Sequence, residues 1–139
     1  MKVHTVPRIT AKILIPYILL FALYVQFHGD FGPGGGFQAG VIFAAGVILY
    51  ALIFGLRRAE QAFPPSAVRV FIALGALIYG GVGVATMMMG GKFLDYSVLA
   101  ADPAHGQHYG ILMIELGVGL TVTTVMIALF YAFAGRRSA

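Results

Sequence analysis

The sequence has no cysteine and few charged residues. Its 139 residues include nine Lys or Arg and five Asp or Glu, so charged residues make up 10% of the chain. Without thiols, the chain forms neither a disulfide nor a thiolate metal site. Soluble domains usually carry about 25% charged residues, whereas 60% of this sequence is hydrophobic. The composition therefore excludes an ordinary soluble domain and predicts an integral membrane protein.

Four apolar segments are each long enough to cross a bilayer, which takes about 20 residues in a helix. They cover approximately residues 9–27, 37–56, 67–89 and 108–134. Little of the chain lies outside them, so we predict an all-α fold with a single four-helix transmembrane domain over residues 1–139. No soluble part remains to hold a catalytic site, and no nucleophile–base pair is visible. We therefore expect no enzyme.

The basic residues gather on one side of this four-span topology. Eight of the nine fall on the side of the two termini, and only Lys92 falls on the other. By the positive-inside rule, both termini and the loop at about 57–66 are cytoplasmic. This segregation accounts for the net charge of +4 without nucleic acid as a partner.

Glu115 is the acidic residue inside a predicted span. Placing a lone carboxylate at the centre of a membrane helix costs about 2.5–3.5 kcal/mol, so it must face protein or water. Helical periodicity places His108, Gly119 and Thr123 on its face, with Glu115 about 10 Å below His108 in the outer half of the bilayer. Glu115 either handles ions or protons, or makes a polar contact that holds an assembly together.

Residues 28–40, between the first two spans, are rich in glycine and contain Pro33. Such a sequence forms a tight turn with exposed backbone. It lacks the Lys-Ser/Thr of a P-loop, which argues against nucleotide binding. Two interpretations remain: a re-entrant turn covered by protein at membrane depth, or a simple tight hairpin.

Two spans carry small residues at helical spacing, which lets neighbouring helices approach closely. In the second span these are Gly36, Gly40 and Ala44, and in the third Ala73, Ala76, Gly80 and Gly83. We expect both faces to pack against protein.

Three histidines fall near the predicted outer surface: His28, His105 and His108. Their spacing is not that of a metal site, so we interpret them as separate interfacial histidines and expect no metal. With Asp30, His28 would form a polar entrance above Glu115 if the first and fourth spans lie close together.

Two motifs carry a family resemblance. They are Pro-Gly-Gly-Gly-Phe-Gln-x-Gly at 33–40 and Glu-Leu-Gly-Val-Gly-Leu-Thr-Val at 115–122. Together they resemble the MnhB family, which are small membrane components of the multisubunit Mrp-type Na⁺/H⁺ antiporters, and the resemblance covers essentially the whole chain. The family pattern falls on His28, Pro33, Gly34, Gly35, Gly36, Phe37, Gln38, Gly40, Glu115, Gly117 and Gly119.

The resemblance implies a small membrane subunit of a hetero-oligomeric antiporter in a bacterial or archaeal plasma membrane. Its partners would be the large antiporter-like subunits, which contain the main proton channels, and other small subunits. Na⁺ and H⁺ would be transported, with no resident cofactor. We predict an ion or proton route through Glu115 with His108, Thr123, His28 and Asp30.

Alternatives remain open for the function. The chain could be a purely structural bridge in an Mrp-like or membrane-bound hydrogenase complex, with no ion path of its own. A small multidrug-type exporter is disfavoured because those exporters carry the glutamate in their first helix. Direct Na⁺ coordination would require Glu115, Gln38 and Thr123 to converge.

Overall fold

The computed structural model of the chain describes residues 5–29 and 31–136. In chain order, the elements are α1 (Thr5–His28), α2 (Gly36–Phe54), α3 (Leu56–Ala62), α4 (Pro65–Met88), the 3-10 helix η1 (Tyr96–Leu99) and α5 (Pro103–Gly135). By length and composition, α1, α2, α4 and α5 can each cross a membrane. The prediction of an all-helical protein with four spans is confirmed.

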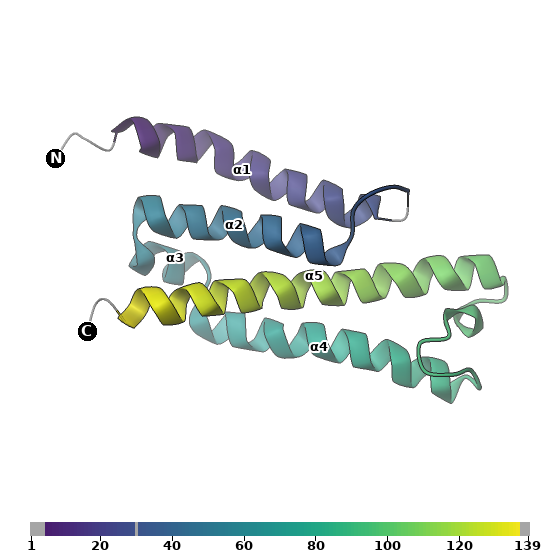
Figure 1. Cartoon of the computed structure of the whole chain (residues 1–139). Coiled ribbons are helices and arrows are strands. Elements are labelled where there is room, and N and C mark those ends of the chain that lie inside the picture. The colour runs from purple at the N-terminus through teal and green to yellow at the C-terminus, as the bar shows by residue number, and fades with distance from the viewer. Residues whose placement is uncertain (1–4, 30, 137–139) are drawn as a thin grey trace.

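The four long helices lie side by side in the spatial order α1, α2, α5, α4 (Figure 1). The main contacts join α1 to α2, α2 to α5, and α5 to α4. Since α1 and α4 are each covered mainly on one side, large apolar side chains on them are exposed, including Leu20, Phe21 and Leu77. Such apolar surface is suited to lipid or to other membrane proteins.

Glycines let α2 and α4 approach α5 closely. A Cβ atom placed on Gly40 of α2 would lie 2.8 Å from the carbonyl oxygen of Gly119 in α5. A Cβ atom on Gly75 of α4 would lie 2.8 Å from the carbonyl oxygen of Gly117 and would overlap the Thr121 hydroxyl. These positions leave no room for a side chain, so the helix separations depend on glycine.

The structure agrees to different extents with the two predictions of packing at small residues. The glycines of the 36–44 stripe on α2 do face α5. On α4, a Cβ atom on Gly83 would overlap the Phe93 ring, whereas one on Gly80 would meet no heavy atom within 4 Å, so the described part of this chain covers only part of the predicted face. The buried side of α4 also includes Val68, Gly75 and Val82, whose spacing of seven keeps them on one side of the helix.

An apolar core lies at the end of the helices where α1 begins and α5 ends, next to α3 (Figure 1). Its buried members are Ala44, Val47, Ala51, Ala59, Val68, Ile127 and Tyr131. The short helix α3 closes this end, because Ala59 is fully buried and the Tyr131 hydroxyl donates to the Phe63 carbonyl at 3.1 Å. The sequence interpretation treated this stretch as part of a loop and missed α3.

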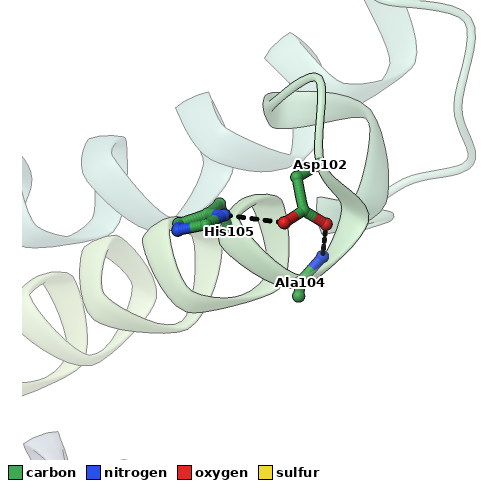
Figure 2. A network of polar contacts seen from close by, with 3 residues as sticks. All are labelled: Asp102, Ala104 and His105. Atoms are coloured by element: carbon green, nitrogen blue, oxygen red, sulfur yellow. Dashed lines mark hydrogen bonds and ion pairs between the residues drawn. The ribbon is translucent and has the colours of Figure 1, made fainter.

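At the opposite end, α5 begins at Pro103, five residues before the predicted span. Asp102 caps the helix, since its carboxylate accepts from the Ala104 N–H at 3.1 Å (Figure 2). Proline is favoured at the first helical position because its missing N–H would have no partner there. This Asp-Pro start extends α5 to 33 residues, or about 50 Å.

The contact between α4 and α5 can be tested with two glycines in the same helix. We expect Gly75→Ala to destabilise the detergent-solubilised protein by about 1–3 kcal/mol, because the added methyl group overpacks the interface. Gly80→Ala is the matched control, and we expect no loss because its surroundings are open. Thermal unfolding followed by circular dichroism would measure both, and equal destabilisation by the two changes would contradict the proposed packing.

Candidate functional site

The glycine-rich turn between α1 and α2 is tightly folded against the end of α1. The Gly35 N–H donates to the Val25 carbonyl at 3.3 Å. Gly35 has a φ of +135°, a conformation that side chains rarely adopt. A Cβ atom on Gly34 would lie 2.8 Å from the Val25 carbonyl oxygen. The turn therefore disfavours a side chain at both positions, because of the backbone conformation at Gly35 and because of the lack of space at Gly34.

This turn lies well short of the beginning of α5 (Figure 1). A Cβ atom placed on Gly36 would overlap the Glu115 carbonyl oxygen. The beginning of α2 is therefore level with Glu115. The helix α5 continues from there for another 12 residues, to Pro103, a distance of about 18 Å. The turn is thus recessed relative to the end of the α4–α5 pair, while Phe31 in the turn and Phe37 at the beginning of α2 are exposed, so the choice between a covered re-entrant turn and a simple hairpin stays a prediction.

The Glu115 carboxylate packs directly against this turn. A Cβ atom placed on Gly29 would lie 2.7 and 2.8 Å from its two oxygens, and one on Gly35 would lie 3.2 Å from Oε1. Glu115 is half-buried and lies beside Gly35, the N-cap of α2. A helix N-terminus carries partial positive charge, so this position suits a carboxylate. The two sequence motifs therefore meet in space.

Thr123, one of the polar residues predicted on this face, lies two helical turns from Glu115. Its hydroxyl donates to the Gly40 carbonyl at 3.2 Å and so joins α5 to α2. Eight residues separate Thr123 from Glu115, which is about 12 Å along the helix. Gln38 is exposed and lies about 200° around α2 from Gly36 and from Gly40. The three candidate Na⁺ ligands thus do not converge in this arrangement.

The two glycines of the second motif face different neighbours. A Cβ atom on Gly119 would overlap the Gln26 side-chain oxygen and lie 3.3 Å from the Gly36 carbonyl oxygen. One on Gly117 would lie 3.0 Å from the Gly75 carbonyl oxygen in α4. This alternation lets α5 pack closely on both sides.

Gln26 of α1 is a site residue that the sequence interpretation missed. Its side chain is only 6% exposed, and its Nε2 has no hydrogen-bond partner among residues 5–29 and 31–136. Gln26 and Thr123 line a cavity of about 210 Å³ between α1, α2 and α5. The available signal was an amide in an apolar span, because Gln26 is the one Asn or Gln within residues 9–27.

The C-terminal end of α1 does reach α5, as the predicted polar entrance requires. Gly29 lies against Glu115, and Gln26 lies against Gly119. His28 is half-buried, and its ring stacks on that of Tyr24 with centroids 5.1 Å apart. Its predicted partner Asp30 lies outside the described residues, so the entrance itself stays a prediction.

The remaining histidines lie near the beginning of α5. His108 is exposed, and its ring meets that of Tyr109 edge-on at 6.0 Å. His105 is exposed and pairs with Asp102 at 2.9 Å (Figure 2). Seven residues separate His108 from Glu115, which is about 10 Å along the helix axis. Within the described part of the chain, no three His, Asp or Glu side chains are grouped for a metal ion.

Comparisons with known proteins match nearly the whole chain. Residues 6–128 match the family described as a domain related to the MnhB subunit of Na⁺/H⁺ antiporter. The chain is 32% identical to the putative antiporter subunit mnhB2 of Staphylococcus aureus strains Newman, JH1 and COL. In each case the match extends over 134 residues and covers 94% of both chains.

Because Gly29 contacts the Glu115 carboxylate, adding one methyl group at Gly29 is expected to reduce transport activity. We expect Gly29→Ala to displace the carboxylate and reduce transport activity at least about tenfold, because small displacements at a functional group can cost that much or more. Gly81→Ala is the control, since a Cβ atom on Gly81 would meet no heavy atom within 4 Å. Cation-dependent proton movement in inverted vesicles would measure both, and normal activity of Gly29→Ala would contradict this geometry.

Replacement of the buried Gln26 amide by an apolar side chain is expected to affect stability and activity in opposite directions. An unpaired buried polar group costs about 1–3 kcal/mol, so we expect Gln26→Met to unfold at the same or a higher temperature. If the amide serves transport, the same variant loses activity. Ala22→Ser, which adds a hydroxyl to the same cavity wall, controls for altered polarity. A clear loss of stability in Gln26→Met would show that the amide has a structural role.

Proposed function

The chain belongs to the family related to the MnhB subunit of Na⁺/H⁺ antiporters, and from this premise we propose that Glu115 forms part of a proton or Na⁺ route. The chain is a subunit of an Mnh/Mrp-type antiporter complex, a transporter component rather than an enzyme. Its four apolar helices and its relatives indicate a multi-pass protein of the bacterial plasma membrane. It assembles there with the other subunits of the complex.

The observation that carries this proposal is the position of the Glu115 carboxylate between α5 and a turn made of glycines. The nearby Gly29 and Gly35 have no side chains, so the carboxylate is next to backbone. Backbone groups offer polar contacts without adding charge, and a helix N-terminus favours an anion. A carboxylate held in this way can bind and release a proton without a change in packing.

Polar groups continue from Glu115 along the same face of α5. The Gln26 amide lies beside Gly119, one turn further, and Thr123 lies one turn beyond that. Gln26 and Thr123 line the same cavity. On α5 its lining begins at Leu116, the residue after Glu115, and includes Gly119 one turn from Glu115. We propose that a proton or hydrated cation follows this line, a length of about 12 Å.

The route requires neighbouring subunits. Since the four helices form an open row rather than a closed bundle, α1 and α4 leave apolar side chains exposed. An ion path in a membrane must be enclosed by protein or water. We propose that other subunits of the complex cover these faces and connect the route to both sides of the membrane.

A structural role for Glu115 is the second candidate. The observation that favours it is the same contact, because a carboxylate that packs against Gly29 and Gly35 can hold the turn and the beginning of α2 in place. In that case the chain bridges larger subunits and transports nothing itself. The two candidates differ in whether ionisation of the carboxylate matters.

Glu115→Gln separates them, because glutamine keeps the size and hydrogen bonding of glutamate but cannot ionise. We expect the variant complex to assemble and to lose antiport by at least about tenfold, in line with the usual effect of removing a proton-transfer group. Co-purification of the subunits would measure assembly, and Na⁺-induced collapse of the pH gradient in inverted vesicles would measure antiport.

Glu115→Asp is the matched control, since it keeps the charge and shortens the side chain by one methylene group. We expect it to retain part of the activity. Loss of assembly in Glu115→Gln would favour the structural role. Unchanged assembly and unchanged antiport would exclude both roles.

A further inference from the structure

A second, larger cavity lies at the other end of the α1–α2 pair. It has a volume of about 590 Å³ and is lined by the beginning of α1, the end of α2, and α3. Pro16, the lining residue of α1 nearest to that site, is 10 residues before Gln26, so about 15 Å separates this cavity from the site around Glu115. The route proposed above makes no use of it.

Three basic side chains line this cavity: Arg8 and Lys12 from α1, and Arg58 from α3. No acidic side chain is among the residues that line it. Within the described part of the chain, the one ion pair is between Asp102 and His105, so none of the three cations is neutralised there. Like charges brought together repel one another, and a bound anion relieves this repulsion.

The cavity is also amphipathic along both long helices. On α1, the cations at positions 8 and 12 are followed by Ile15 and Pro16, about one turn deeper. On α2, Phe54 is at the end of the helix and Tyr50 is one turn deeper. The Arg8 guanidinium lies 5.9 Å from the centre of the Phe54 ring. Charge at the rim and apolar surface below match a ligand with an anionic head and a hydrocarbon tail.

We propose that this cavity binds an anionic phospholipid, with the phosphate at the three cations and one acyl chain along Ile15 and Tyr50. The basic end of the chain is the side predicted to be cytoplasmic, where anionic lipids attract basic groups next to membrane helices. A free phosphate ion would use the cations but not the apolar wall. The bound lipid would contact both α1 and α3 and so stabilise the position of α1, the helix at the end of the row.

The test uses the complex purified in detergent, with palmitoyl-oleoyl phosphatidylglycerol as the probe and the phosphatidylcholine of the same chains as the neutral reference. Native mass spectrometry measures how much of each lipid the complex retains. The test variant combines Arg8→Gln, Lys12→Gln and Arg58→Gln. Each charge near a membrane surface contributes about fivefold to the binding of anionic lipid, so we expect roughly a hundredfold weaker retention of phosphatidylglycerol, with phosphatidylcholine unchanged.

The matched control combines Arg57→Gln, Arg69→Gln and Arg136→Gln. It removes three charges from the same end of the chain, but none of these residues lines the cavity. We expect it to retain phosphatidylglycerol nearly as well as the unchanged complex. Equal losses in the two triple variants would overturn the proposal, because they would show attraction by net charge alone.

Three further outcomes are decisive. Displacement of the lipid by inorganic phosphate, as effectively as by a second anionic lipid, would overturn the proposal in favour of a soluble anion. Loss of a partner protein from the lining variant with unchanged lipid retention would show that an acidic protein segment fills the cavity. If the triple variant does not assemble, Arg58→Gln alone is expected to weaken retention about fivefold, and unchanged retention would overturn the proposal.

Discussion

The close approach of α2 and α5 is the contact on which the rest of the structure depends. At Gly36 and Gly40, the backbone of α2 comes so near to Glu115 and Gly119 that a methyl group would not fit. This separation brings the end of α1 and the glycine turn against the carboxylate, since both are tied to the beginning of α2. The site is therefore a product of helix separation rather than of any single side chain.

The sequence predicts the spans, the glycine stripe on α2, and Glu115 as the unusual residue, because each has a local signal. It does not predict that the turn and Glu115 touch, since that depends on how far α5 extends beyond α2. The contact at Gly75 and the burial of Gln26 were missed for a related reason. Helical spacing shows which residues share a face, but the neighbouring helix decides which face is buried. The short helix α3 was missed because Ala59 is buried by tertiary packing.

The two ends of the molecule carry charged side chains of opposite sign in different surroundings. Around Glu115, one carboxylate is surrounded by backbone and by the N-terminus of α2, with Gln26 and Thr123 as the further polar groups along α5. At the other end, Arg8, Lys12 and Arg58 gather around one cavity that no acidic residue lines. The first arrangement can change its charge with little rearrangement, whereas the second has a fixed charge. The two proposals together would give one small membrane protein both a site for mobile ions and a fixed site for an anionic lipid.

The spatial order of the helices also constrains how the protein is made. Of the four long helices, α5 is synthesised last, and it lies between α2 and α4 (Figure 1). Because domains tend to fold from the N-terminus as synthesis proceeds, the earlier helices must wait in the membrane without their shared neighbour. Gly36, Gly40 and Gly75 stay uncovered until α5 arrives, and Glu115 reaches the turn only at that moment. A chain truncated before α5 lacks Glu115 and therefore cannot form the carboxylate site. The site thus exists only after α5 has been synthesised.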